Sequence, residues 1–293
     1  MPLVPLLLVL GAAVTHAAWN IIAHGSSRSG LPFLWWGAVC SAVLWAVAVP
    51  FTGGLGAATP GSLLLGVGVS GLLHVLYMLV LQRGYANGDL STVYATARGT
   101  GPILTVLVAV AVLGERPGSL ALVGVALVIG GVVAFGVVGR SAPGERRRRL
   151  DPGLVYGLLT GVGIAAYTVW DAHAVTELGI APVAFMVGCS LAEIPFFTAL
   201  LLLEGRRGAL ARLRAELRLN RMRLLAFGLL SPLAYVLVLT AVTLAPVSLV
   251  APVREVSVVL VGLYGAFRHR ESRPALRLVA ATVVVAAVVL VAL

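Results

Sequence analysis

Two arginines that lie inside long apolar stretches are the residues of this sequence best suited to chemistry. Arg98 lies within residues 91–113 and Arg254 within residues 248–267. An arginine at the centre of a membrane helix costs about 2.5–3.5 kcal/mol on insertion scales, so it usually faces a cavity or a partner group. Because the planar guanidinium matches the oxygens of a carboxylate or a phosphate, both arginines are candidates for holding an anion. Alternatively, each is structural, capping backbone carbonyls or extending to the nearer membrane surface.

Prolines close to both arginines indicate interrupted helices. Pro102 has no N–H for the carbonyl of Arg98, and glycines flank it, so we expect a kink there. Pro252 stands just before Arg254. Backbone groups that such an interruption frees beside a cation make an anion-binding point.

Three acids also lie in apolar stretches: Asp171, Glu193 and Glu255. One of them is a candidate for carrying a coupling proton, because burial favours the neutral form of a carboxyl group. Alternatively, they balance the charges of Arg98 and Arg254. Glu255 adjoins Arg254, but neighbours along a helix point in different directions, so these two do not form an obvious pair.

Other polar residues of the apolar stretches suit the wall of a polar cavity. His16 and Asn20 are four residues apart and His74 and Tyr77 three apart, so each pair shares one face of a helix. Tyrosines complete this set: Tyr94, Tyr167 and Tyr235. Hydrogen bonding between helices explains any single one of them equally well, and both interpretations stay open.

The composition indicates that a membrane surrounds these residues. Hydrophobic residues make up 60% and charged residues 11% of the chain, and the mean hydropathy is +1.04. Soluble domains are about 45–50% apolar and about 25% charged. The chain is therefore expected to be a polytopic membrane protein. Its 21 cations are all arginine, and the net charge of +10 is interpreted as membrane anchoring and orientation rather than nucleic-acid binding.

About 20 mostly apolar residues span a bilayer as a helix. Ten segments meet this requirement: 3–23, 32–51, 62–82, 91–113, 119–139, 152–172, 181–203, 223–243, 248–267 and 275–293. Ten crossings bring both ends to one side, and eighteen arginines fall in the connectors of the opposite face. By the positive-inside rule, that face is cytoplasmic and the termini are external. The basic connector 204–222 is either an amphipathic helix on anionic lipid or a solvated linker.

The chain repeats itself at a spacing of about 156 residues. Glu115 follows Arg98 by seventeen residues, and Glu271 follows Arg254 by the same number. The first five spans thus correspond to the last five, and an odd number of spans inverts the second copy in the membrane. We expect an all-α integral membrane protein of ten helices in two inverted five-helix repeats, residues 1–140 and 152–293, joined by a basic linker at 141–151.

The ends of both repeats resemble a known family. The runs YATARGTGPILTVLVAVAVLGERP (94–117) and APVREVSVVLVGLYGAFRHRESRP (251–274) are similar to the signature that ends an EamA-type half in the drug/metabolite transporter superfamily. HAAWN (16–20) and YTVWDAHAV (167–175) resemble one bacterial branch. That branch often has Pro where Ala95 stands and Gly-Glu where this chain has His269-Arg270-Glu271. The resemblance implies membrane transport of small metabolites without ATP. Members of the superfamily often have cytoplasmic termini, whereas the distribution of arginines in this chain predicts external ones.

Several chemistries are missing from the sequence. It has no Gly-Lys-Ser/Thr phosphate loop, no His/Cys cluster with metal-ligand spacing and no Ser nucleophile elbow. We therefore expect no enzyme, no cofactor, no metal site and no nucleic-acid partner. The hypothesis is a secondary transporter of the bacterial inner membrane, an exporter or exchanger of a small anionic or zwitterionic metabolite, with homodimer formation left open. The alternatives are efflux of drugs or organic cations, and an integral-membrane enzyme or scaffold.

Overall fold

The computed structural model describes residues 1–23, 30–88, 90–138, 152–269 and 274–293. Within these ranges the regular structure is helical, apart from an isolated antiparallel bridge between Gly56 and Ile180. The expected linker 141–151 and Glu271 lie outside the described residues, as do several arginines on which the orientation was argued. We refer to residues 1–138 as the first half and to residues 152–293 as the second half.

The first half contains five α-helices and a short 3-10 turn. Their bounds are α1 (Leu3–Ala23), α2 (Leu31–Ala46), η2 (Val49–Phe51), α3 (Pro60–Asn87), α4 (Leu90–Ala111) and α5 (Ser119–Val138). The start of α3 illustrates the local rules. Pro60 occupies the first turn, where a missing N–H has no consequence, and the Thr59 hydroxyl accepts a hydrogen bond from the N–H of Ser62.

The second half contains α6 (Pro152–Thr176), α7 (Pro182–Val242), α8 (Val247–Arg254), α9 (Val256–His269) and α10 (Pro274–Ala292). The long helix α7 changes direction at Gly205 and Asn220, whose backbone angles are not helical. The basic connector between these two residues was expected to be either an amphipathic helix or a solvated linker. In the structure it is helical. Its Leu210 and Leu219 are exposed, as are Arg214 and Arg218, which fits a segment lying at a membrane surface.

Many large apolar side chains lie on the outside of the helices. Leu64 is 72% exposed on α3, Leu107 58% on α4 and Val285 61% on α10. In the described residues, six helical segments are long and apolar enough to cross a membrane, and three shorter ones are apolar as well. An outer surface of this kind suits lipid rather than water, so the all-helical chain is a multi-pass membrane protein.

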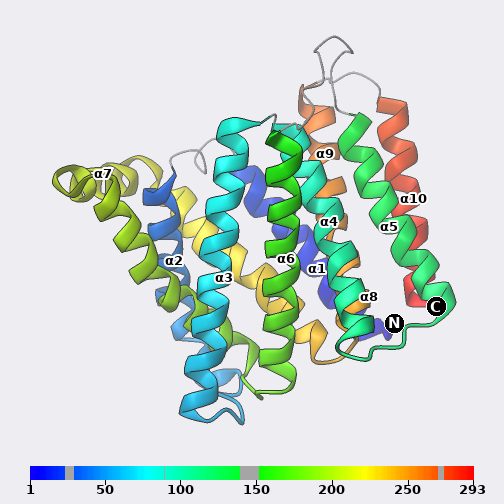
Figure 1. Cartoon of the computed structure of the whole chain (residues 1–293), viewed down its shortest axis with the longest axis horizontal. Helices are drawn as coiled ribbons and strands as arrows, with labels where there is room; N and C mark the ends of the chain where they lie inside the picture. Colours follow the sequence, from blue (N-terminus) through cyan, green and yellow to red (C-terminus); the bar gives the residue numbers. More distant parts are fainter. Residues whose placement is uncertain (24–29, 89, 139–151, 270–273) are drawn as a thin grey trace.

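Small residues allow α4 of the first half to pack closely against α6 of the second. A Cβ atom on Gly157 would lie 2.6 Å from Cβ of Thr96, and one on Gly161 equally close to Cβ of Thr100. Close approach of backbones through small residues is a usual way for membrane helices to associate. Figure 1 shows α3, α4 and α6 next to one another at the centre of the molecule. This packing brings the Arg98 segment against the second half.

The two ends of the chain lie together. The amino group of Met1 donates hydrogen bonds to the carbonyls of Val291, at 2.9 Å, and Ala292, at 3.0 Å. Beside them, α5 packs against α10, where Gly124 faces Ala287 and Val291 (Figure 1). The chain therefore begins and ends on one side of the molecule.

The helix that contains Pro102, where a kink was predicted, continues past the proline. Helix α4 runs through Pro102 from Leu90 to Ala111, and the interruption occurs in the second half, between α8 and α9. There the N–H of Glu255 bonds the carbonyl of Pro252, so the chain tightens into a 3-10 turn. Helix α4 tolerates its proline because membrane helices re-satisfy freed backbone groups locally.

Candidate functional site

Arg98 and Glu255 form an ion pair between the two halves. Nη1 of Arg98 lies 3.3 Å from Oε1 and 3.4 Å from Oε2 of Glu255. Both side chains are largely buried, at 14% and 5% exposure, and the Arg98 guanidinium also lies 5.3 Å from the centre of the Tyr94 ring. A buried guanidinium and a buried carboxylate each relieve the other of an uncompensated charge. Glu255 thus belongs with Arg98, although it adjoins Arg254 in the sequence.

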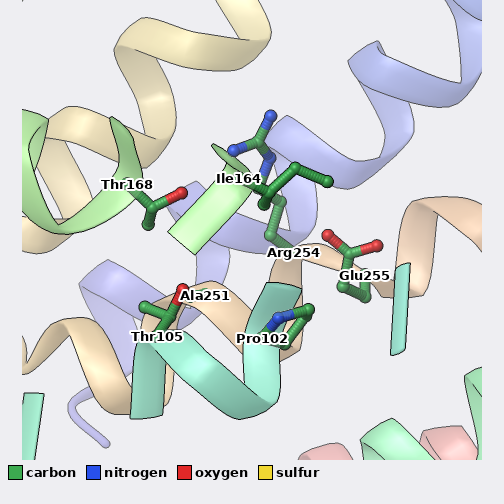
Figure 2. Close-up of a pocket in the computed structure, with 7 residues that line it drawn as sticks. All are labelled: Pro102, Thr105, Ile164, Thr168, Ala251, Arg254 and Glu255. Carbon is green, nitrogen blue, oxygen red and sulfur yellow. The ribbon is translucent and has the colours of Figure 1, made fainter. Parts of the chain in front are cut away.

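Arg254 has a different environment. Its guanidinium lies 5.3 Å from the centre of the Tyr235 ring, a cation–π contact. No carboxylate in the described part of the chain lies within ion-pair distance of it. Figure 2 shows the side chains of Arg254 and Glu255 as separate groups beside the cavity. Arg254 is therefore a partly buried cation held by an aromatic face instead of an acid.

A small cavity separates α4, α6 and α8 at this point. It is lined by Pro102, Thr105, Ile164, Thr168, Ala251, Arg254 and Glu255 (Figure 2). Its volume is about 10 Å³, roughly the room that one water molecule needs. The helices must move apart before a metabolite can reach the two charged residues.

An aromatic cluster lies next to this cavity, on α3, α6 and α7. The His74 ring stacks on Tyr167, with ring centres 4.2 Å apart and planes 28° apart. Tyr77 packs against Tyr167 at 5.3 Å, and Tyr235 meets the edge of His74 at 5.8 Å. Four of the residues predicted to line a cavity thus form one cluster.

Asp171 is the acid of the aromatic cluster. It is 1% exposed, and its Oδ2 accepts a hydrogen bond from the hydroxyl of Tyr235. Nε2 of His74 lies 3.9 Å from the same oxygen. The other oxygen, Oδ1, has no hydrogen-bond partner among the described residues. Tyr235 therefore connects Asp171, through its hydroxyl, with Arg254, through its ring.

The remaining predicted residues lie at the edge of this arrangement. His16 is buried, and its ring meets the Trp19 ring edge-on, with ring centres 4.9 Å apart. It also interacts electrostatically with Arg98 and Arg254. Asn20 donates its amide hydrogen bond to the carbonyl of His16, within α1, and is not joined to the cluster by a described contact. Glu193 is half-buried on α7 and interacts electrostatically with Asp171.

Sequence reasoning missed two contributors. Ser70 lies beneath His74, whose Nδ1 is 3.0 Å from the Ser70 carbonyl and 3.2 Å from its hydroxyl. The four-residue spacing of this pair was a signal that would have found it. Glu115 was noted only for its spacing from Arg98, but its carboxylate accepts the N–H groups of Val247, at 2.8 Å, and Ser248, at 2.9 Å. It thereby caps the N-terminus of α8, the helix that carries Arg254.

Comparison with known proteins bears on both fold and function. Residues 151–293 match the EamA-like transporter family. One solved structure, described only as the crystal structure of a protein, superposes with a TM-score of 0.72 at 16% identity, covering 98% of this chain and 95% of that one. At this identity the likeness concerns the fold alone. None of the curated proteins compared matches the sequence.

Proposed function

We propose that the substrate of this chain carries a negative group. The premise is that the chain is an EamA-type protein of the drug/metabolite transporter superfamily, and hence a membrane transporter of small molecules. The substrate class is a small anionic or zwitterionic metabolite. The chain acts as a secondary transporter, an exporter or exchanger, in the bacterial inner membrane.

The observation that carries this proposal is the environment of Arg254. Its charge lies beside a cavity between the halves, over the Tyr235 ring and without a carboxylate partner among the described residues. A guanidinium in low-dielectric surroundings binds a carboxylate or phosphate far more strongly than one in water. The charge of Arg98, by contrast, is matched by Glu255 in this conformation.

Each residue of the site has a role in this proposal. Arg254 is the first contact of the anionic group, and Arg98 exchanges Glu255 for the anion as the helices separate. Polar side chains then form the wall of the opened site: His16, Asn20, His74, Tyr77, Tyr94, Tyr167 and Tyr235. Because the cavity has room for only about one water, transport requires the halves to open alternately to each side.

The pairing of helices supports inverted repeats that move in this way. Helix α4 of the first half packs against α6, the first helix of the second half, and α1 packs in turn against α8 and α9. Helices α5 and α10, which end the two halves, pack against each other. Such reciprocal contacts are expected when two five-helix repeats, 1–140 and 152–293, surround a shared site.

We further propose that the arginine-rich connectors face the cytoplasm and that both termini are external. The contact between Met1 and the last turn of α10 supports the common side of the termini. A membrane-impermeant label at a tag on either end tests the direction. Labelling of intact cells is expected, and labelling only after lysis would reverse the orientation.

A second candidate function is efflux of organic cations. The favouring observation is Asp171, a buried carboxylate among the rings of His74, Tyr167 and Tyr235. Aromatic faces with an acid suit a quaternary ammonium group. This candidate assigns the two arginines a structural role.

Flux into sealed proteoliposomes distinguishes the two functions. The labelled anionic probes are succinate, glutamate and phosphonoacetate, and the cationic probes are ethidium and tetraphenylphosphonium. We expect uptake of at least one anionic probe, lost in Arg254→Gln and retained in Arg116→Gln, which removes an exposed loop arginine. Uptake of the cations alone, unchanged in Arg254→Gln, would establish the second candidate instead.

A further inference from the structure

The contacts of His74 determine which of its ring nitrogens carries hydrogen. Nδ1 lies 3.0 Å from the carbonyl oxygen of Ser70, a group that has only lone pairs to offer. The Ser70 hydroxyl lies 3.2 Å from the same nitrogen, and both Ser70 oxygens can accept a hydrogen from it. A nitrogen lone pair would face the lone pairs of the carbonyl, so we assign the hydrogen to Nδ1. In the neutral ring Nε2 is then an unprotonated acceptor.

The unprotonated Nε2 of His74 faces another hydrogen-bond acceptor, the carboxylate of Asp171. Oδ2 of Asp171 lies 3.9 Å from Nε2 of His74, and Oδ1 of the same carboxyl group has no described partner. The Tyr235 hydroxyl donates to Oδ2, and the Ser70 side chain also interacts with the carboxyl group. A buried carboxylate with one unpartnered oxygen, opposite a nitrogen lone pair, is unfavourable unless a proton lies between them.

We propose that Asp171 and His74 together form a binding site for one proton, and that this proton is the coupling ion of the transporter. The proton comes from water and is held as imidazolium beside carboxylate, or as carboxylic acid beside neutral imidazole; no covalent bond is otherwise made or broken. The proposal rests on the proposed function in its transport role but not in its proton binding. It separates the three candidate acids: Glu255 is paired with Arg98, and Glu193 lies outside the aromatic cluster.

Other charged and titratable groups surround the pair on every packed helix. These are Tyr77 on α3, Tyr167 on α6, Cys189, Glu193 and Tyr235 on α7, and Arg254 on α8. Glu193 adds negative charge, which favours a bound proton, whereas Arg254 opposes it. The balance between these two charges makes the proton site sensitive to what binds at Arg254.

Tyr235 provides the direct link between the two sites. Its hydroxyl donates to Asp171, and its ring lies 5.3 Å from the Arg254 guanidinium carbon. An anion bound at Arg254 cancels the positive charge that opposes protonation of the pair. Anion and proton therefore favour each other's binding, as reciprocal linkage requires. The loaded protein then crosses its conformational change with less net charge in the membrane interior.

Proton binding is measurable without knowing the metabolite. Nitrogen-15 NMR of histidine-labelled protein in detergent reports the tautomer and the protonation of each ring as pH varies. We expect His74, assigned by its loss in His74→Gln, to be the Nδ1–H tautomer and to bind its second proton about tenfold or more weakly in Asp171→Asn. The control Glu177→Gln removes an exposed acid at the end of α6 and leaves this titration unchanged.

Two results would overturn the proton site. One is an Nε2–H tautomer of His74 throughout the titration, and the other is an unchanged titration in Asp171→Asn. If Asp171→Asn does not fold, infrared difference spectra of His74→Gln provide the test. The Asp171 band of the wild type, carboxyl or carboxylate, is expected to shift in His74→Gln and not in His173→Gln, whose ring packs against Trp170 instead. An unshifted band there would also contradict the proposal.

The transport role has its own measurement. Proteoliposomes that contain a pH-sensitive dye are exposed to whichever anionic probe the wild type transports. We expect proton movement with the anion in the wild type and anion movement without protons in His74→Gln. Equal proton movement in both would refute coupling at this pair while leaving anion transport intact. Absence of anion flux in the wild type would refute the proposed function and leave the NMR result standing.

Discussion

The Arg98 guanidinium of α4 lies 3.3 Å from the Glu255 carboxylate at the start of α9, so an ion pair joins the two halves across the interior of the protein. One residue to the N-terminal side, Arg254 lies over the Tyr235 ring, and no carboxylate among the described residues is within ion-pair distance of it. The two interior arginines thus differ in how their charges are satisfied. In this conformation Arg254 has no carboxylate partner among the described residues, whereas Arg98 is paired with Glu255.

Arg98→Ala is expected to lower stability as well as transport. Removing one member of a buried ion pair leaves the other charge unpaired and typically costs about 3–5 kcal/mol. The double variant Arg98→Met with Glu255→Gln has no orphaned charge, so most of this loss should be recovered. Thermal unfolding in detergent checks both; a single variant as stable as the wild type would mean that the pair does not hold the halves together.

Tyr235→Phe isolates the hydroxyl of Tyr235 from its ring. The phenyl ring keeps its contact with Arg254, whereas Asp171 loses its described hydrogen-bond donor. A buried polar group left unsatisfied costs about 1–3 kcal/mol, more when it is charged. We expect lower thermal stability with anion affinity nearly retained, and a further loss of affinity in Tyr235→Leu, which removes the ring. Equal affinities in the two variants would argue against a role for the ring in holding Arg254.

Gly161 tests the close packing between α4 and α6. A Cβ atom there would lie 2.6 Å from Cβ of Thr100, which the backbone of α4 holds in place. Gly161→Ala should therefore force the helices apart and cost about 1–3 kcal/mol, as overpacking typically does. In Gly130→Ala the new Cβ meets nothing within 4 Å, so this control is expected to be neutral or stabilising through its better helix propensity. A neutral Gly161→Ala in thermal unfolding would contradict the packing argument.

Much of the fold was predictable because the membrane imposes a length on each helix. The 20-residue rule predicts segments 3–23 and 275–293, and the structure has α1 at Leu3–Ala23 and α10 at Pro274–Ala292. The rule does not locate interruptions. A kink was expected at Pro102, but α4 continues through it, and the chain leaves the helix at the α8–α9 junction instead. The family assignment followed from the repeated signature, of which the second copy lies within the matched residues 151–293.

The partners within the site were not predictable from spacing. Arg98 and Glu255 are 157 residues apart, and Asp171 and Tyr235 are 64 apart. These residues stood out in the sequence because each is polar in an apolar stretch. That is a property of each residue alone and does not show which residues meet. Which of them meet depends on how the helices pack, and the turn after Pro252 that separates α8 from α9 appears only in the structure. The substrate roles of all of them stay predictions.

Glu115 is expected to stabilise the helix that carries Arg254. Its carboxylate accepts the N–H groups of Val247 and Ser248 at the positive end of the α8 dipole. Glu115→Ala should cost about 0.5–2 kcal/mol, the range found for loss of a helix cap. Glu177→Ala, which removes an exposed acid, is the matched control. Unfolding temperatures that do not differ between the two variants would mean that the cap has no energetic role.

The central claim is that the interior arginines hold the anionic group of a substrate rather than only balancing interior acids. The most direct test is flux of the transported anionic probe by Arg98→Met with Glu255→Gln, a variant that removes both charges of the buried pair. Its control is Arg212→Met with Glu204→Gln, which neutralises the half-exposed pair at 2.7 Å on α7. The account predicts a folded protein without anion flux, beside a control that transports like the wild type. Wild-type flux in the doubly neutral variant would contradict it, because Arg98 would then serve only to neutralise Glu255.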